Sequence, residues 1–387
     1  MKVRNAMAAL AITLAAPAVA QTPGVSDTEI KIGSAQDLSG LFAAFSVPAK
    51  AAAEMVFDEV NAEGGIHGRK ITYIVEDHGY QVPKAVQAAN KLVNRDQVFA
   101  MMNNLGTPHN IAMFQLMGPQ SIPNVAPITA ARQMVEPFEP WKFLPTATYY
   151  GAIKEATNYL IDEQGAKKFC TMLLPTDFGK EIEEGVKEVA SERGLEMGAE
   201  LAHKPDETDF TGAFGKIKAS GCDTVAVGLG VSQMINAIAT AHKLGMGDLK
   251  FLLSGAGFHT VVAQGLAAQG VSGGVYACSG WQDLAARMDV PEVAAWVKEY
   301  SDANGGKFPG SGAILGHSGA LMVVRALEAA GPDLTREGFI KAMEALNYED
   351  VIAGNTISMS DTDHTSSEEI FISVVEDGGW KLLKTID

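Results

Sequence analysis

The 387-residue sequence is too long for one ordinary hydrophobic core, so we expect two lobes. Its 47% apolar and 20% charged residues are typical of a well-packed soluble chain and exclude a disordered one. The net charge of −16 argues against nucleic acid and anionic membranes as partners and indicates an acidic surface that promotes solubility.

Residues 1–20 predict a cleaved signal peptide. Lys2 and Arg4 precede a short apolar stretch, and residues 18–20 (Ala-Val-Ala) have the small-x-small form of a signal-peptidase site. The stretch is too short to span a membrane as a mature helix. Gln21 follows the site where a lipoprotein would need a cysteine, so we expect a soluble protein exported across the inner membrane.

The first unit after this segment predicts a strand, a helix and a strand. Alternating apolar residues at 29–35 predict the first strand, residues 48–61 predict a helix with a proline in its first turn, and residues 69–75 predict the second strand. The loop after the first strand brings Ser39 and Gly40 to a helix start. Backbone N–H groups and the helix dipole converge there, which suits a small anion.

Strand and helix keep alternating, which predicts a mostly parallel sheet covered on both faces. The next expected elements are helices at 83–94 and from 111, and strands at 98–102 and 121–126. Three loops follow the carboxyl ends of strands: 37–45, 103–107 and 127–132. We expect these loops to gather on one edge of the sheet, where ligands of open α/β folds bind.

The pattern restarts near residue 143 and predicts a second α/β lobe of similar construction. Its expected strands are 168–174, 195–202, 222–228 and 250–253. Its expected helices are 150–163, one that follows the turn at 175–179 and ends at 193, one that begins at 208, and 232–244. Later helices at 291–304, 312–330 and 335–345 have to return to the first lobe, and strands 370–375 and 380–383 form a hairpin. The fold class is therefore α/β, with two Rossmann-like lobes, mostly parallel sheets and several crossings that form a hinge.

The motifs of enzymes and metal sites are missing from the sequence. It has no nucleophile elbow, phosphate loop, metalloprotease helix or paired-cysteine zinc motif, so we expect no catalysis, metal or cofactor. Cys170 and Cys222 lie at the starts of two predicted neighbouring strands, so one bridge between them is an alternative, but two buried free thiols are the favoured interpretation. Residues 361–364, with Glu368 and Glu369, are interpreted as an exposed acidic turn and not as a cation site.

Aromatic residues at the loop ends indicate a small-molecule pocket. Phe45, Tyr149, Tyr150 and Phe178 each lie in or just after a loop at the expected cleft mouth. With the hydroxyls of Thr107 and Thr129 they would give apolar walls and few directed polar groups, as in many small-molecule sites.

Short motifs spread over the chain resemble the leucine/isoleucine/valine-binding family of type I periplasmic binding proteins, the solute receptors of ABC importers. They are Leu-Ser-Gly at 38–40, Gly-Gly-Ile-x-Gly at 64–68, Leu-Gly-Thr-Pro at 105–108 and Asp-Phe-Gly at 177–179. The resemblance implies a three-crossing hinge, a ligand in the cleft between the lobes, closure like a trap, and delivery to an inner-membrane ABC permease. It also implies a periplasmic monomer. The lobes would comprise residues 26–146 with 277–352, and residues 147–276 with 353–387.

The resemblance also implies a set of ligand-binding positions. The family's carboxylate loops match Leu105, Gly106, Thr107, Thr129 and Ala130. Its first-loop aromatic falls near Phe45, and its second-lobe aromatic, often a tyrosine, falls on Phe178, which lacks the hydroxyl. Tyr150 joins the predicted ligand-binding residues because of its place at the expected cleft mouth.

The family's acid for an amino-acid ammonium should follow strand 250–253, where residues 254–258 (Ser-Gly-Ala-Gly-Phe) contain no carboxylate. An ammonium buried without a counter-charge costs several kcal/mol. We therefore expect a small carboxylate without an amine, an aromatic or branched carboxylic acid. A branched-chain amino acid remains the alternative if Asp177 or another acid replaces the missing group.

Two other functions are alternatives to the solute receptor of an importer. A binding protein of this kind could present its closed form to a signalling receptor instead of a permease. A secreted α/β hydrolase would need a positioned nucleophile and base, and no such set is evident in the sequence.

Overall fold

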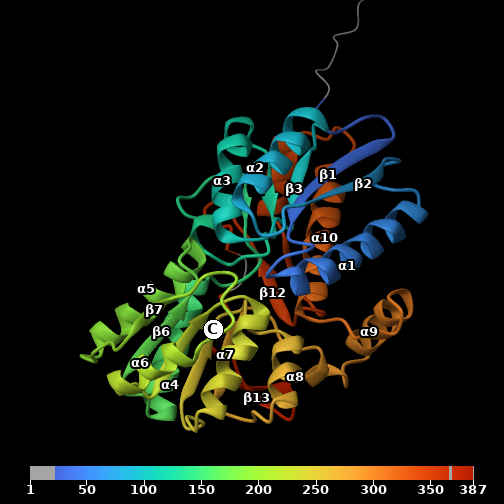
Figure 1. Cartoon of the computed structure of the whole chain (residues 1–387). Helices are drawn as coiled ribbons and strands as arrows, with labels where there is room; N and C mark the ends of the chain where they lie inside the picture. The colour runs from blue at the N-terminus through green and yellow to red at the C-terminus, as the bar shows by residue number, and fades with distance from the viewer. Residues whose placement is uncertain (1–21, 366–367, 387) are drawn as a thin grey trace, which may run out of the picture.

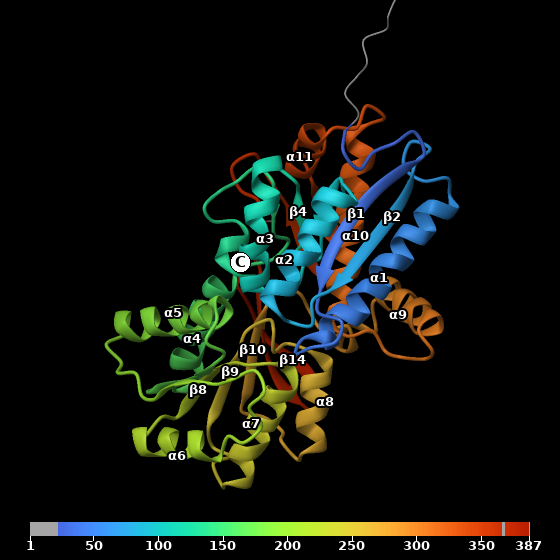
Figure 2. The same ribbon diagram turned by 45° about the horizontal axis from the view of Figure 1, so that its top comes forward.

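Two separate β-sheets organise the chain into two lobes (Figures 1 and 2). The computed structural model describes residues 22–365 and 368–386. The expected signal peptide at 1–20 lies outside the described residues. The α/β class with mostly parallel sheets and two lobes is confirmed.

The first lobe contains a five-stranded parallel sheet in the order β2-β1-β3-β4-β5. Its strands are β1 (Glu29–Gln36), β2 (Lys70–Asp77), β3 (Ala100–Met102), β4 (Asn124–Val125) and β5 (Lys142–Phe143). Its helices are α1 (Ala43–Ala62), α2 (Val82–Asn90), α3 (Thr107–Met117), α9 (Pro291–Ala303), α10 (Ser311–Ala330) and α11 (Arg336–Glu344). The return of the later helices to this lobe is therefore confirmed, because α10 packs along α1 and against β4.

The second lobe contains a seven-stranded sheet in the order β14-β13-β10-β9-β8-β6-β7. Its parallel strands are β6 (Phe169–Leu173), β7 (Glu200–Ala202), β8 (Thr224–Gly228), β9 (Lys250–Leu253) and β10 (Val275–Ser279). The hairpin of β13 (Ile370–Glu376) and β14 (Gly379–Ile386) adds an antiparallel edge. Its helices are α4 (Tyr149–Gln164), α5 (Asp177–Glu192), α6 (Thr211–Ser220), α7 (Val231–Lys243) and α8 (Thr260–Ala268).

The chain passes between the two sheets three times: after β5, after β10, and after the small hairpin of β11 (Asn347–Asp350) and β12 (Asn355–Ser358). The lobe boundaries proposed from the sequence stay a prediction. The strand register does place Ala277, Cys278 and Ser279 in the second sheet, where they pair with β13.

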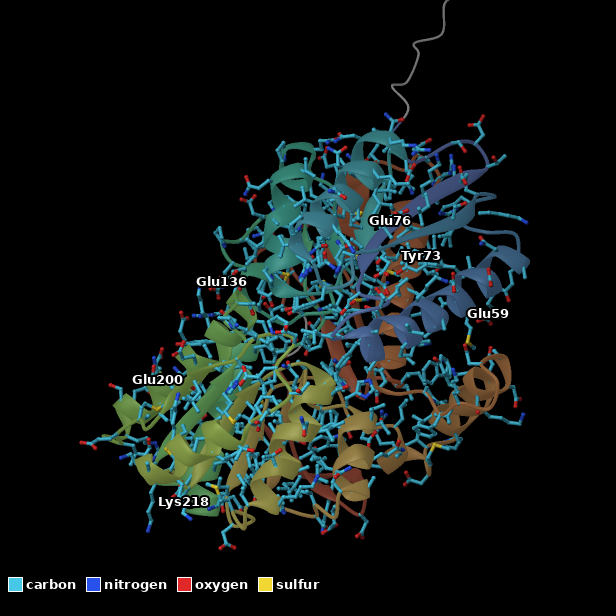
Figure 3. All side chains as sticks on the ribbon, in the orientation of Figure 1. Glu59, Tyr73, Glu76, Glu136, Glu200 and Lys218 are labelled. Atoms are coloured by element: carbon cyan, nitrogen blue, oxygen red, sulfur yellow. A yellow bond between two sulfur atoms is a disulfide. The ribbon has the colours of Figure 1, made fainter. Side chains whose placement is uncertain are left out.

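Helix α10 is long and apolar enough to cross a membrane by length and composition alone. It instead packs inside the first lobe, where Gly312 and Gly316 allow close contact with α1. A Cβ atom at either glycine would lie 2.1–2.2 Å from a backbone oxygen of α1. This helix is therefore part of the core. Charged side chains such as Glu59, Glu136, Glu200 and Lys218 lie on the outside of the two lobes (Figure 3).

Helix α1 begins five residues before the expected start. Its first residue is Ala43, so Pro48 lies inside the helix and not in its first turn. The buried carboxylate of Asp37 accepts hydrogen bonds from the backbone N–H groups of Gly40 and Phe42, which fixes the loop and allows the helix to begin early. Because proline has no N–H, Pro48 leaves the carbonyl of Ala44 without its usual helical partner.

The expectation of free thiols at Cys170 and Cys222 is wrong, because the two residues form a disulfide with Cα atoms 5.9 Å apart. Strands β6 and β8 are direct neighbours, and Cys170 pairs with Val225, three residues after Cys222. Gly198 leaves room for the bond, since a Cβ atom there would lie 2.2 Å from the Cys222 sulfur. Cys278 is buried and free.

The double variant Cys170→Ala/Cys222→Ala is expected to lose stability. The bond closes a segment of 52 residues, and the chain-entropy relation gives about 4 kcal/mol for a loop of that length. Urea unfolding with and without dithiothreitol measures the effect. The variant Cys278→Ala is the control and should keep the sensitivity to dithiothreitol. Equal stability of oxidised, reduced and double-variant protein would contradict a structural role for the bond.

Candidate ligand-binding site

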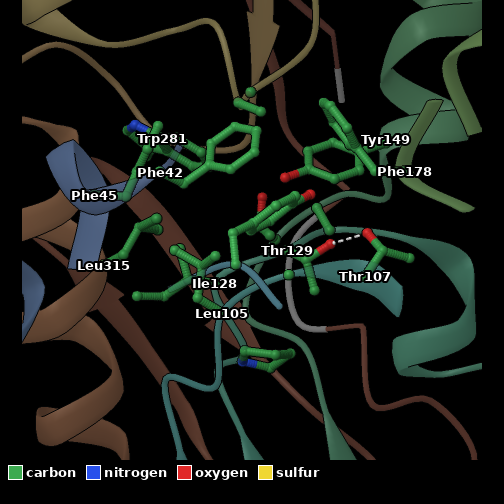
Figure 4. A pocket seen from close by; sticks show the side chains of 17 residues that line it. Phe42, Phe45, Leu105, Thr107, Ile128, Thr129, Tyr149, Phe178, Trp281 and Leu315 are labelled. Atoms are coloured by element: carbon green, nitrogen blue, oxygen red, sulfur yellow. Dashed lines mark hydrogen bonds between the residues drawn. The ribbon is translucent and has the colours of Figure 1, made fainter. Parts of the chain in front are cut away.

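A pocket lies between the lobes, at the carboxyl ends of the parallel strands of both sheets (Figure 4). It contains about 500 Å³ of empty space, part of which is open to solvent. Its lining consists of aromatic and aliphatic side chains, hydroxyls and backbone: Phe42, Phe45, Tyr80, Leu105, Gly106, Thr107, Pro127, Ile128, Thr129, Ala130, Thr146, Tyr149, Phe178, Gly255, Ala256, Trp281 and Leu315.

The polar corner of the pocket is built by the loops after β3 and β4. Gly106 has φ +96°, and a Cβ atom there would lie 2.3 Å from the imidazole of His109, so this turn requires glycine. Helix α3 then begins at Thr107, whose hydroxyl is 2.7 Å from the hydroxyl of Thr129 (Figure 4). Within the described residues, the backbone N–H groups of Thr107 and Thr129 have no backbone acceptor. They are therefore free to bind an oxygen of a ligand.

Tyr149 extends this polar corner from the second lobe. Its hydroxyl lies against the hydroxyl of Thr129 and the backbone N–H of Ala130, and the backbone N–H of Tyr149 donates to the carbonyl of Ala130. Burial raises the pKa of Tyr149 to about 12. The phenol is therefore protonated at neutral pH and is a hydrogen-bond donor.

The walls of the pocket are aromatic and come from both lobes. The ring of Phe42 in the first lobe lies 6.0 Å, edge to face, from the ring of Phe178 in the second, and Phe178 lies 5.4 Å from Tyr149. Trp281 and Phe45 continue the wall. Such a surface favours a flat or branched apolar group.

None of the described residues that line the pocket carries a formal charge. The nearby acids are already engaged. Asp37 accepts backbone hydrogen bonds within its own loop, Asp177 pairs with Lys180, and buried Glu181 accepts from the backbone N–H and the guanidinium of Arg132. The loop after β9 contributes Gly255 and Ala256, as expected for the loop without a carboxylate.

Direct contacts hold the lobes together around the pocket. Nε2 of His259, in the second lobe, lies 3.1 Å from the carbonyl of Ala44 in α1, the carbonyl that Pro48 leaves without a partner. Nδ1 of His259 accepts from the backbone N–H of Val261 at 3.0 Å, which makes Nε2 the donor. The His259 ring also contacts Phe45, with ring centres 4.6 Å apart.

Seven of the eight predicted site residues lie in the pocket: Phe45, Leu105, Gly106, Thr107, Thr129, Ala130 and Phe178. Tyr150 does not. Its hydroxyl donates to Glu188 and its ring lies under the guanidinium of Arg132, outside the pocket. The preceding residue, Tyr149, lines the pocket instead, because consecutive helical residues point about 100° apart. Whether these residues bind a ligand remains a proposal.

The sequence interpretation missed several lining residues, among them Tyr80 and Trp281. Both follow a parallel strand closely, Tyr80 after β2 and Trp281 after β10. The rule that ligand-binding loops follow strand carboxyl ends, applied to these two strands as well, could have found them.

We expect the free energy of unfolding to decrease as the pH falls from about 6.5 to 4. His78, His109 and His259 are buried, and desolvation lowers the pKa of each to about 4. In the unfolded chain each pKa returns to about 6.5, so the unfolded state binds more protons in this range. The loss is up to about 1.4 kcal/mol per pH unit for each histidine.

Urea unfolding between pH 7.5 and pH 4.5 measures this slope. The variant His259→Gln keeps a donor for the carbonyl of Ala44 but cannot titrate, so its slope should be smaller than that of the unmodified protein. Identical slopes for the two proteins would exclude His259 as a contributor.

The comparisons with known proteins agree with this geometry. A model of the periplasmic binding protein family matches residues 29–379. The chain is 26% identical over 223 residues to an "Amino acid binding protein" of Pseudomonas aeruginosa, a match that covers 54% of this chain and 57% of that protein. It is 24% identical over 318 residues to "Leu/Ile/Val-binding protein homolog 2" of Brucella abortus, covering 80% of each.

Solved structures show the same fold. A fatty acid ABC transporter substrate-binding protein from Thermomonospora curvata superposes with a TM-score of 0.84 at 27% identity, over 95% of this chain and 94% of that one. A branched-chain amino acid ABC transporter protein from Thermus thermophilus with bound valine gives a TM-score of 0.82 at 19% identity, over 93% and 96%.

Fold and pocket define a two-lobed α/β solute-binding protein with a pocket between the lobes. The chain belongs to the periplasmic binding protein family, type I.

Proposed function

We propose that the protein is the solute receptor of an ABC importer and binds a small carboxylate without an amine, with an aromatic or branched apolar group. The observation that carries this proposal is a pocket with a corner of hydroxyls and free backbone N–H groups but no charged side chain among its described lining residues. Closure around the ligand in the periplasm and delivery to an inner-membrane permease complete the proposed role.

The polar corner suits a carboxylate for electrostatic reasons. The backbone N–H of Thr107 stands at the N-terminus of the 11-residue helix α3, where the helix dipole favours negative charge. The hydroxyls of Thr107 and Thr129 lie together in this corner, and among the described residues the backbone N–H of Thr129 has no backbone acceptor. A carboxylate would therefore receive several hydrogen bonds without a counter-cation.

An ammonium finds no comparable partner. An amino acid would bury its positive charge beside phenol and threonine hydroxyls, and burial of an unpaired charge costs several kcal/mol. The names of the relatives include amino-acid and fatty-acid binders, so both ligand classes belong in the test. A sensory role, in which the closed form contacts a receptor, is the second candidate and uses the same pocket.

Calorimetry on refolded, ligand-stripped protein tests the ligand class. We expect binding of a simple aromatic acid such as 4-hydroxybenzoate, or of a branched acid such as 4-methylpentanoate, and no tight binding of leucine, because only leucine carries the uncompensated ammonium. Leucine binding tighter than that of both acids would overturn the proposal that the ligand lacks an amine.

The variants Thr107→Val and Thr129→Val should each weaken binding of the carboxylate by about 1–3 kcal/mol, because each removes one hydrogen-bond donor and keeps the side-chain shape. Thr107→Ser and Thr129→Ser are the matched controls, since they retain the hydroxyl. Unchanged affinity in both valine variants would contradict the assignment of the carboxylate to this corner.

A further inference from the structure

Tyr80 lies in the pocket in a backbone conformation that bulky residues rarely adopt. Its φ is +56°, in the left-handed region. A short turn after β2 enforces this conformation, with the Tyr80 backbone N–H donating to Nδ1 of His78 at 3.1 Å. Strain of this kind in a pocket-lining residue indicates that its position is needed for function.

The ring of Tyr80 is held firmly while its hydroxyl is free. The ring lies 4.8 Å from the ring of Phe42 and 4.5 Å from that of His109. Within the described part of the chain, the hydroxyl makes no hydrogen bond to another protein group. Burial raises the pKa of Tyr80, so the phenol is a donor at neutral pH.

The side chain of Tyr80 borders the polar corner. Its ring lies against His109, whose imidazole lies beside Gly106. Tyr80 also lines the same pocket as Tyr149, Thr129 and Ala130. Figure 4 shows Tyr149 and the hydrogen-bonded pair Thr107 and Thr129 facing the same central space. Burial raises the pKa of Tyr149 to about 12, so this phenol is also protonated at neutral pH.

The pocket therefore offers two phenols, Tyr80 and Tyr149, in addition to the threonine hydroxyls and backbone N–H groups of the polar corner. We propose, on the basis of the proposed function, that the ligand carries an oxygen on the carbon next to its carboxylate, so that it is a 2-oxo or 2-hydroxy acid, and that Tyr80 donates to this oxygen. Tyr80 is thus a specificity-determining residue. It selects an acceptor oxygen at the position where an amino acid would carry its ammonium.

The test uses acids that differ only at carbon 2. Ligand-stripped protein is titrated with 4-methylpentanoate, 4-methyl-2-oxopentanoate and 2-hydroxy-4-methylpentanoate, and with the aromatic pair 3-phenylpropanoate and phenylpyruvate. Within the series that binds, branched or aromatic, we expect the 2-oxo or the 2-hydroxy acid to bind about tenfold more tightly than the parent acid. This is the usual effect of one added hydrogen bond. Tyr80→Phe should remove this preference, so that the ratio of the Kd values of the parent and the oxygenated acid falls to about one.

The control Tyr276→Phe removes a phenol outside the pocket, one that donates to Gln164 at 2.9 Å, and should keep the preference. Equal Kd values of the parent and both oxygenated acids would overturn the inference, as would a Tyr80→Phe variant that weakens all acids by the same factor. In both cases the parent acid still binds and the proposed function survives. If no acid of the branched or the aromatic series binds, the proposed function fails, and the inference fails with it.

Discussion

In parallel β-sheets the carboxyl ends of neighbouring strands lie at the same edge, and the pocket of this protein depends on that constraint. Tyr80 follows β2, Gly106 follows β3, and Thr129 follows β4, so three separate loops of the first lobe meet at one place. Gly255 and Trp281 follow β9 and β10 of the second sheet in the same way. The two edges face each other, and the pocket between them combines side chains that are far apart in the sequence.

The site is electrically neutral although the molecule is acidic. Charged side chains such as Glu59, Glu136, Glu200 and Lys218 lie on the outside of the lobes. The acids near the pocket are engaged in loop, helix or interlobe contacts, as Asp37 and Glu181 illustrate. A neutral site attracts an anion only through the directed dipoles of hydroxyls and N–H groups. Its preference is therefore set by which hydrogen bonds a ligand can complete, and a ligand that brings an ammonium gains nothing from this arrangement.

Contact between the lobes uses a feature of the backbone. Pro48 lies inside α1 and cannot donate to the carbonyl of Ala44, and His259 of the other lobe donates to this carbonyl instead. The first-lobe helix thus offers the second lobe an acceptor that a regular helix would have used internally. The same histidine contacts Phe45 of the pocket wall, so ligand contacts and lobe contacts share residues.

The sequence by itself determined the alternation of strands and helices, the division into two lobes, the loops that carry the threonines, and the lack of a carboxylate after β9. These are local properties, since the periodicity and turn residues of a segment follow from its own composition. Only the tertiary structure decided which neighbour faces the pocket, Tyr149 or Tyr150, and that Cys170 lies within bonding distance of Cys222. It also brought Tyr80 into the same pocket as Tyr149. Those outcomes depend on the rotation of a helix and on the order of strands in a sheet, which are set by packing between segments distant in the chain.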